Sequence, residues 1–209
     1  MTRREWLRRA SVAMLAGTAL PRAASAQAEW TPLFDGATLG RWEQTAFGGE
    51  GPVRVRDGAI VLEMGDPLTG ITWTGHALPA AYEVALQAAR LAGSDFFCGL
   101  TFPVGPSHCS LILGGWGGTT VGLSSIDGLD ASENQTTRQM RFEDTRWYAV
   151  RVAVTATHIR AWLDDTPIVE VATAGRRIGI RPEVDPSRPL GIASYRTRAG
   201  VRDIRLRAL

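Results

Sequence analysis

Three carboxylates recur every three residues in one glycine-containing stretch of the chain: Asp127, Asp130 and Glu133. Carboxylate oxygens are the usual ligands of hard divalent cations, and a carboxylate held beside a cation can also act as a general base. The spacing differs from that of an EF-hand loop, so a solvated acidic turn or a calcium site that only stabilises the loop is also compatible with it. We therefore expect either a divalent cation, such as calcium, held by all three residues, or Asp127 or Glu133 as a catalytic base, or a structural turn.

Histidine is the second residue type that could abstract a proton, and the chain has three: His76, His108 and His158. Their spacing matches no local zinc motif, and a surface or structural role is favoured for each of them. His108 is the preferred catalytic base among the three, because it lies in the chain between Asp95 and Trp116.

Tryptophan is the residue most suited to hold a sugar, because an indole stacks on the apolar face of a pyranose and keeps its N–H free for a hydroxyl. Trp116 lies between two glycine pairs, where a loop could expose the ring. Trp73 and Trp162 are also predicted to reach a ligand. Core packing is the alternative for all of them, and it is favoured for Trp30 and Trp42.

The two cysteines, Cys98 and Cys109, lie on either side of a predicted turn at 103–107. An exported chain with two cysteines favours a disulfide. Folding in a reducing cytoplasm before export would instead leave two buried thiols, and a catalytic cysteine has no histidine in an obvious partner position.

The elements that must position these side chains are β-strands. Residues 82–89 and 148–155 alternate between apolar and other residues, as does 159–163, and a polar turn at 164–167 leads into another apolar run. Further strands are predicted at 52–56, 59–63, 70–74, 96–102, 109–113, 119–124, 190–195 and 200–207. More than ten short strands without a convincing amphipathic helix predict an all-β fold, a two-sheet antiparallel β-sandwich or jelly roll.

The first 26 residues have the features of an export signal, and cleavage is expected after the small residues at 24–26. A cluster of arginines precedes an apolar run at 10–20 that is shorter than the ~20 residues of a membrane-spanning helix. The pattern at 2–8 is similar to a twin-arginine signal, and an ordinary secretory signal is the alternative. We expect a bacterial protein that is periplasmic or secreted, without a transmembrane span, with residues 27–209 forming one domain.

Charge argues against nucleic acid as a partner. Five of the 23 basic and one of the 21 acidic residues fall in the signal, which leaves 18 basic and 20 acidic residues in the mature chain. Binding to nucleic acid needs a concentrated basic surface. Every basic residue is arginine, so a Schiff-base lysine is excluded as well.

The stretch at 30–42, Trp-Thr-Pro-Leu-Phe-Asp-Gly-Ala-Thr-Leu-Gly-Arg-Trp, resembles the opening of the 3-keto-disaccharide hydrolase domain family. The segments 53–61, 146–171 and 190–206 resemble later elements of the same family, in the same order. The resemblance implies a concanavalin A-like jelly roll, a carbohydrate ligand and cleavage of glycosides whose sugar carries a 3-keto group. Two central stretches, 93–100 and 109–118, depart from the family pattern, and the second carries no charge.

A 3-keto group acidifies the proton on C2 of the sugar, so the implied chemistry is proton abstraction followed by elimination of the glycosidic group. It needs a base, for which Asp127, Glu133 and His108 are the candidates, and a cation or donors to hold the enolate. Substrate contacts are expected from Trp116 and Trp73, together with Asp95, Asn134 and Arg138. A non-catalytic carbohydrate-binding jelly roll is the main alternative: the uncharged strand at 109–113 favours binding, whereas the acidic loop favours an enzyme. A structural or partner-binding envelope domain is a third.

Overall fold

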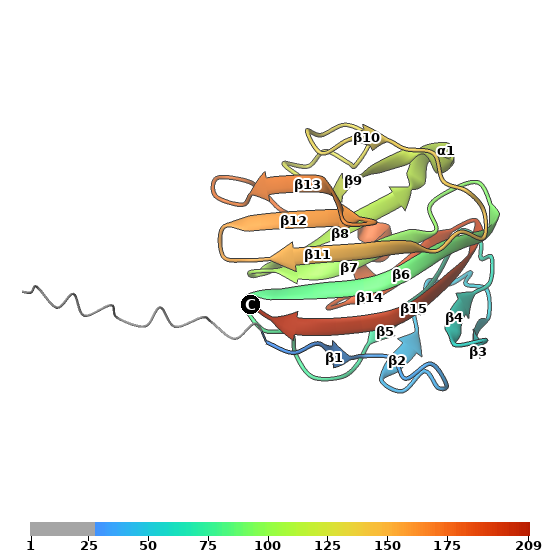
Figure 1. Ribbon diagram of the computed structural model, residues 1–209. Helices are drawn as coiled ribbons and strands as arrows, with labels where there is room; N and C mark the ends of the chain where they lie inside the picture. The colour runs from blue at the N-terminus through green and yellow to red at the C-terminus, as the bar shows by residue number, and fades with distance from the viewer. Residues whose placement is uncertain (1–27) are drawn as a thin grey trace, which may run out of the picture.

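Two antiparallel β-sheets pack face to face in the computed structural model, which describes residues 28–209 (Figure 1). The predicted two-sheet sandwich is therefore confirmed. The export signal predicted at 1–26 lies outside the described residues. Within 28–209, no helix combines the length and the apolar character needed to cross a membrane.

The sheet nearer the viewer in Figure 1, called here the front sheet, has the strand order β13-β12-β11-β6-β15-β4-β3, and β1 pairs with β15. The bounds of these strands are β1 (Thr31–Pro32), β3 (Val53–Arg56), β4 (Ala59–Leu62), β6 (Tyr82–Gly93), β11 (Tyr148–Val154), β12 (His158–Leu163), β13 (Thr166–Ala172) and β15 (Thr197–Ala208).

The second sheet, called here the back sheet, has the order β10-β9-β8-β7-β14-β5-β2. Its strands are β2 (Trp42–Gln44), β5 (Leu68–Trp73), β7 (Cys98–Val104), β8 (Ser107–Gly114), β9 (Thr120–Ser124), β10 (Arg138–Gln139) and β14 (Gly191–Tyr195). Two short helical elements complete the chain: α1 (Gly115–Gly118) between β8 and β9, and the 3-10 helix η1 (Pro182–Ser187) before β14.

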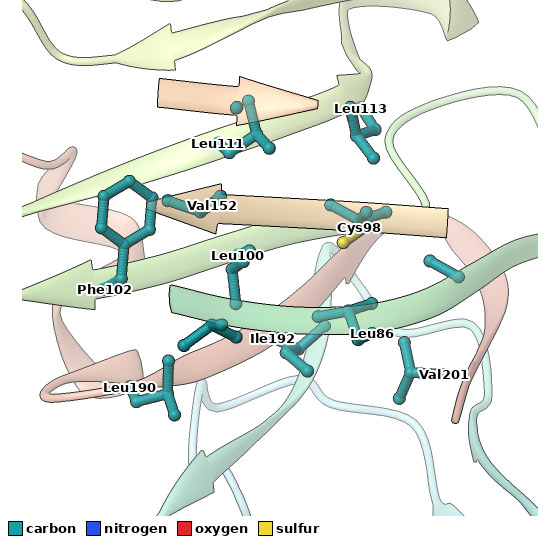
Figure 2. Packing of buried hydrophobic residues seen from close by; sticks show 14 of the residues in the cluster. Leu86, Cys98, Leu100, Phe102, Leu111, Leu113, Val152, Leu190, Ile192 and Val201 are labelled. Atoms are coloured by element: carbon teal, nitrogen blue, oxygen red, sulfur yellow. The ribbon is translucent and has the colours of Figure 1, made fainter. Parts of the chain in front are cut away.

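The hydrophobic core fills the space between the sheets, as the period-two patterns predict. In β6, the inward side chains of Tyr82, Val84, Leu86 and Ala88 are at most 2% exposed. Figure 2 shows Leu86 and Val152 of the front sheet among Leu100, Leu111 and Ile192 of the back sheet. Because successive residues of a strand point to opposite faces, the remaining residues of each strand form the two outer faces of the sandwich.

The predicted hairpin near residue 164 is confirmed and is tighter than expected. Asp164 and Asp165 have φ values of 46° and 60°, so these two residues alone connect β12 to β13. Positive φ at both positions belongs to the type I′ turn, and aspartate tolerates this conformation better than most residues. The Asp164 carboxylate also accepts hydrogen bonds from the Ala149 N–H at 2.8 Å and from Arg146 at 2.9 Å.

The two cysteines are buried free thiols, the alternative expected for a chain that folds before export. Both side chains enter the core from neighbouring strands, but the register pairs Cys98 with Leu113 and Cys109 with Phe102. Burial raises the pKa of both thiols to about 12, so neither is a nucleophilic thiolate near neutral pH.

The segment 173–190 leaves β13 in the front sheet, includes η1 and reaches β14 in the back sheet; it is called here the crossing segment. Three hydrogen bonds tie it to the back sheet and its loops. Ser107 Oγ donates to the Ile178 carbonyl at 2.7 Å, Thr72 Oγ1 to the Pro186 carbonyl at 3.1 Å, and the Ser125 N–H to the Gly179 carbonyl at 2.6 Å. The crossing segment therefore lies against the outer face of the back sheet and raises a wall there.

Candidate functional site

A cavity of about 400 Å³ opens on the outer face of the back sheet, between the sheet and the crossing segment. The outward positions of its central strands carry small side chains, such as Gly99 on β7, Ser110 on β8, Gly122 on β9 and Ala193 on β14. Such side chains cannot fill the space above the sheet, and Ser110 is part of the cavity floor. The volume falls in the range of natural small-molecule sites.

Trp116 stands at the rim of the cavity because the glycine-rich element α1 is a turn rather than a regular helix. Gly114, Trp116, Gly117 and Gly118 all have positive φ, 48° for Trp116 itself. Left-handed backbone is strained for tryptophan and free for glycine, so the glycine neighbours allow this turn. The indole is 44% exposed and lines the cavity, at the place where the sequence predicted an exposed ring.

Asp95 lines the same cavity and is fixed by backbone donors. Its Oδ1 accepts the Phe96 N–H at 2.7 Å, and its Oδ2 accepts the Gly117 N–H at 3.2 Å. The second bond joins the carboxylate directly to the turn that carries Trp116. Within residues 28–209, no arginine forms an ion pair with Asp95, so the carboxylate is oriented but not neutralised.

Two further aromatic side chains complete the rim. Phe96 and Tyr195 lie with ring centroids 5.7 Å apart and both line the cavity. Together with Trp116 they supply the flat apolar surfaces on which pyranose rings stack, and the Tyr195 hydroxyl adds a donor.

The opposite wall is charged and comes from the crossing segment. Arg181 donates to both carboxylate oxygens of Glu183, at 3.3 and 2.9 Å, and to Asp130. The hydrogen bond from Arg181 lowers the pKa of Glu183, and the same bond raises the pKa of Arg181. Glu183 is therefore a weak base, and Arg181 is a permanent cation beside the cavity.

The acidic loop, predicted to hold a metal, holds the crossing segment in place. Asp127 accepts a hydrogen bond from Arg176 at 2.7 Å and one from the Arg177 N–H at 2.8 Å, and Asp130 pairs with Arg181. The Arg177 N–H, followed by Arg176, lowers the pKa of Asp127. Within 28–209, no three histidine, cysteine or acidic side chains form a group that could hold a metal ion, so the divalent cation stays a prediction.

The remaining base candidates, Glu133 and His108, are not among the residues that line the cavity. Glu133 is exposed on the acidic loop. His108 points outward from β8, two residues before Ser110, and is half-buried. Burial, and next to it the charge of Arg188, lowers the pKa of His108.

Two predicted substrate contacts have structural roles. Asn134 is 7% exposed, donates to the carbonyls of Leu123, Leu129 and Asp130, and accepts from Thr136, which anchors the acidic loop to β9. Arg138 donates through Nε to the Ile168 carbonyl at 2.5 Å, which joins β10 to β13. Neither side chain lines the cavity.

Trp73, predicted to contact a sugar, has its indole in the core. Its side chain is 6% exposed, packs in the core with its ring centroid 5.3 Å from that of Trp42, and donates to the His76 carbonyl. Trp73 points inward from β5, so its indole surface is used by the core. Trp30, predicted to lie in the core, is instead partly exposed.

The sequence reasoning missed Arg181, Glu183, Tyr195 and Ser110. One signal for the cavity was present: small residues at alternate positions of neighbouring strands. Arg181 and Glu183 gave no signal, because their position depends on contacts with a loop about 50 residues away along the chain.

The sequence profile of the 3-keto-alpha-glucoside-1,2-lyase-like domain family matches residues 29–207. The chain belongs to this family. The match runs from the segment before β1 to the end of β15, so family membership covers both sheets and the cavity between the back sheet and the crossing segment. No curated protein sequence matches the chain.

Solved structures share the fold at low sequence identity. A Bacillus subtilis protein of unknown function with a galectin-like fold has a TM-score of 0.60 at 12% identity, covering 86% of this chain and 94% of its own. A candidate glycosyl hydrolase from Parabacteroides distasonis ATCC 8503 has a TM-score of 0.57 at 14% identity, with coverage of 86% and 94%. Domain 4 of an extracellular GH43 arabinanase from Geobacillus stearothermophilus, in complex with arabinotriose, has a TM-score of 0.54 at 14% identity, with coverage of 87% and 93%.

Proposed function

We propose that the protein cleaves 3-keto-glycosides in the cavity of the back sheet, by proton abstraction at C2 and elimination of the glycosidic group. The observation that carries this proposal is that one aromatic-rimmed cavity contains both Asp95 and the cation Arg181. Asp95 is an oriented carboxylate that no arginine of residues 28–209 neutralises. Family membership supports the choice of substrate class. Export, predicted from residues 1–26, would place the reaction in the periplasm or outside the cell.

Asp95 is the residue that we assign as the base. Of the two carboxylates that line the cavity, Glu183 is held by Arg181 and its pKa is lowered, whereas Asp95 accepts only backbone N–H groups among the contacts of the described chain. A carboxylate removes the C2 proton readily, because the neighbouring ketone delocalises the resulting charge onto its oxygen.

Arg181 is the group that we assign to this oxygen. In the proposed reaction, the proton passes from C2 to Asp95 and negative charge develops on the C3 oxygen, close to a fixed guanidinium. The C1–O bond then breaks, the aglycone oxygen takes up a proton, and a C1–C2 double bond remains conjugated to the ketone. Addition of water to this enone gives the free 3-keto sugar. Glu183 and Asp130 act as positioning residues, because they hold Arg181 against the cavity.

The aromatic rim would hold the sugar ring. Trp116 is the most exposed aromatic side chain of the rim, and the turn that carries it is hydrogen-bonded to Asp95, the assigned base. A substrate stacked on Trp116 would therefore be fixed relative to Asp95, which is the positional requirement of proton transfer.

The test is release of free sugar from a 3-keto-disaccharide by the purified protein, with and without a chelator. We expect turnover by the unchanged protein and a fall of about 10²–10⁴-fold in kcat for Asp95→Asn, since general-base catalysis contributes that much. Glu133→Gln is the matched control, an exposed acid of the acidic loop that lies outside the cavity and makes no ion pair within residues 28–209, and it should retain kcat within about threefold. Loss of activity in Glu133→Gln but not in Asp95→Asn would overturn the assignment.

The aromatic rim also suits the alternative, a carbohydrate-binding module, which needs the same stacking surfaces without the base. Measuring both binding and turnover of the same 3-keto-disaccharide distinguishes the two functions. Saturable binding of the 3-keto-disaccharide, lost in Trp116→Ala and unaccompanied by any turnover, would assign binding alone. Loss of turnover on adding chelator would show that a metal ion takes part, as predicted for the acidic loop.

A further inference from the structure

A second hollow, of about 260 Å³, lies on the outer face of the front sheet. One register row crosses it: Trp162 on β12 pairs with Arg151 on β11, Arg151 with Ala85 on β6, and Ala85 with Arg205 on β15. Figure 1 shows these four strands side by side. Because neighbouring strands lie about 4.8 Å apart, the short side chain of Ala85 leaves a depression between two guanidinium groups.

A tryptophan lines the hollow at either end, and each indole is held by arginine. The guanidinium of Arg151 lies 3.7 Å from the ring centroid of Trp162, and those of Arg207 and Arg205 lie 4.6 and 5.1 Å from that of Trp30. Both tryptophans are partly exposed. Stacking on a guanidinium fixes the plane of an indole and occupies one of its faces, so the exposed remainder can receive the apolar face of a sugar ring.

The arginines of the hollow differ in how their charge is used. Arg151 and Arg207 both pair with Glu83, whose side chain is only 6% exposed. The only carboxylate near Arg205 within residues 28–209 is Asp203, at 3.7 Å, which is longer than a hydrogen bond. The Nε of Arg205 is buried and has no hydrogen-bond partner in this part of the chain. Arg205 is therefore the arginine of the hollow with unused donors.

The charge balance selects the class of ligand. Three arginines of the hollow face Glu83 and the lining carboxylates Asp165 and Asp203, so positive and negative groups are equal in number. A polyanion such as single-stranded nucleic acid needs a surplus of positive charge along its track, which this face lacks. A guanidinium between two indoles whose nearest carboxylate is 3.7 Å away, that of Arg205, instead suits a ring with an apolar face and a single carboxylate.

We propose that this hollow binds a uronate unit of an acidic glycan. The sugar carboxylate pairs with Arg205 and the pyranose ring stacks on Trp30 or Trp162. The site is separate from the cavity of the back sheet and does not depend on the reaction proposed there. It would attach the protein to a glycan in which single uronate units stand among neutral sugars, while the other face remains free to react.

The test is calorimetric titration of the purified protein with trigalacturonate, and with maltotriose as a neutral trisaccharide. Saturable binding of trigalacturonate is expected, at least tenfold tighter than that of maltotriose. Arg205→Gln and Trp162→Ala should each weaken it tenfold or more. Arg160→Gln and Trp116→Ala should leave it unchanged: the first removes an exposed arginine from the outer face of the same strand as Trp162, and the second alters the other cavity.

Ala85→Leu tests the same site without removing a charge or an aromatic ring, because the larger side chain fills the hollow. It should abolish trigalacturonate binding, and thermal unfolding checks that each variant keeps its fold. Absence of saturable binding would overturn the proposal, as would binding that survives Ala85→Leu. Equal affinity for maltotriose would overturn the proposed preference for an acidic sugar. Displacement of trigalacturonate by a tighter-binding oligothymidylate would assign the face to nucleic acid instead.

Discussion

The two outer faces of the sandwich are built on similar strands but carry side chains of different size. On the back sheet the central outward positions include small residues such as Gly99, Ser110 and Ala193 beside Ile112, and a cavity of about 400 Å³ remains beneath the crossing segment. On the front sheet the outward positions of β6, β11, β12 and β15 include arginine, glutamate, glutamine and tryptophan beside alanines, and a hollow of about 260 Å³ remains around Ala85. The size of the outward side chains therefore decides how large a ligand each face can hold: the back face has a cavity, and the front face has a smaller hollow.

Ion pairs also differ between the two faces. Of the pairs that hold the crossing segment, Asp127 with Arg176 is exposed, and Asp130 with Arg181 is partly exposed. Glu83 on the front sheet is buried between two arginines. Exposed pairs contribute little to stability, whereas loss of one partner from a buried pair is costly. We therefore assign the pairs of the back face to positioning and those of the front face to stability.

The largest effect is expected from filling the cavity. Ser110→Leu places a branched side chain on the cavity floor and should reduce release of sugar from a 3-keto-disaccharide by on the order of 100-fold or more, because displacement of a substrate by about 1 Å already has this effect. Ala85→Leu, the matched change on the front face, should leave this activity unchanged.

Initial rates and thermal unfolding of the two variants give the readout. Equal loss of activity in both variants at unchanged stability would break the distinction between the faces, because it would mean that the front sheet takes part in the reaction.

Much of the fold could be predicted because it depends on short-range pattern. The alternation in β6 and β11 and the aspartate turn at 164–165 are local properties, and all three are confirmed. A disulfide and two buried thiols both stayed open because pairing of cysteines depends on strand register, which the two cysteines alone do not define. Trp73 was predicted at the surface and lies in the core, and Trp30 was predicted in the core and is partly exposed. The sequence around each tryptophan is compatible with either a buried or an exposed side chain.

The second prediction concerns Glu83. Replacing it with glutamine leaves Arg151 and Arg207, with side chains 29% and 15% exposed, without their shared carboxylate. We expect a loss of about 2–3 kcal/mol in the free energy of unfolding, below the range for fully buried pairs because both arginines reach solvent.

Glu170→Gln is the matched control, since Glu170 pairs with Arg160 on the same face but is 64% exposed. Its loss should stay below about 0.5 kcal/mol in urea-induced unfolding. Similar losses for the two variants would show that burial does not distinguish the pairs of the front face.

The third prediction is a pH dependence, and it is the smallest effect. The pKa of Asp127 lies below its ordinary value of 3.8 in the folded protein, so its contribution to stability is complete above that value and disappears as the pH falls through the lowered pKa. Thermal unfolding of the unchanged protein and of Asp127→Asn should therefore differ by a constant amount from pH 7 to pH 5 and converge under more acidic conditions.

Glu133→Gln serves as the control on the same loop, since Glu133 makes no ion pair within residues 28–209. Its unfolding temperature should follow that of the unchanged protein at every pH. A difference between the unchanged protein and Asp127→Asn that persists into strong acid would contradict the ionic attachment of the crossing segment.

The candidate site was predictable only in part, for a physical reason. Trp116 and Asp95 lie at the cavity because local glycines and a neighbouring strand place them there. The acidic loop looked like a metal site or a base because three carboxylates stood close together in the sequence. Its partners, Arg176 and Arg181, lie about 50 residues further along the chain, so pairing between them could not be read from local spacing.

The most direct measurement of the central claim, that the sugar is bound in the cavity of the back sheet, is fluorine NMR of Asp95→Asn labelled with 5-fluorotryptophan during titration with a 3-keto-disaccharide. Because this variant should bind without turning over, the resonance of Trp116 is expected to shift saturably, while those of the buried Trp73 and of Trp162 on the front sheet stay unchanged. A titration that shifts Trp162 and leaves Trp116 unchanged would contradict the account.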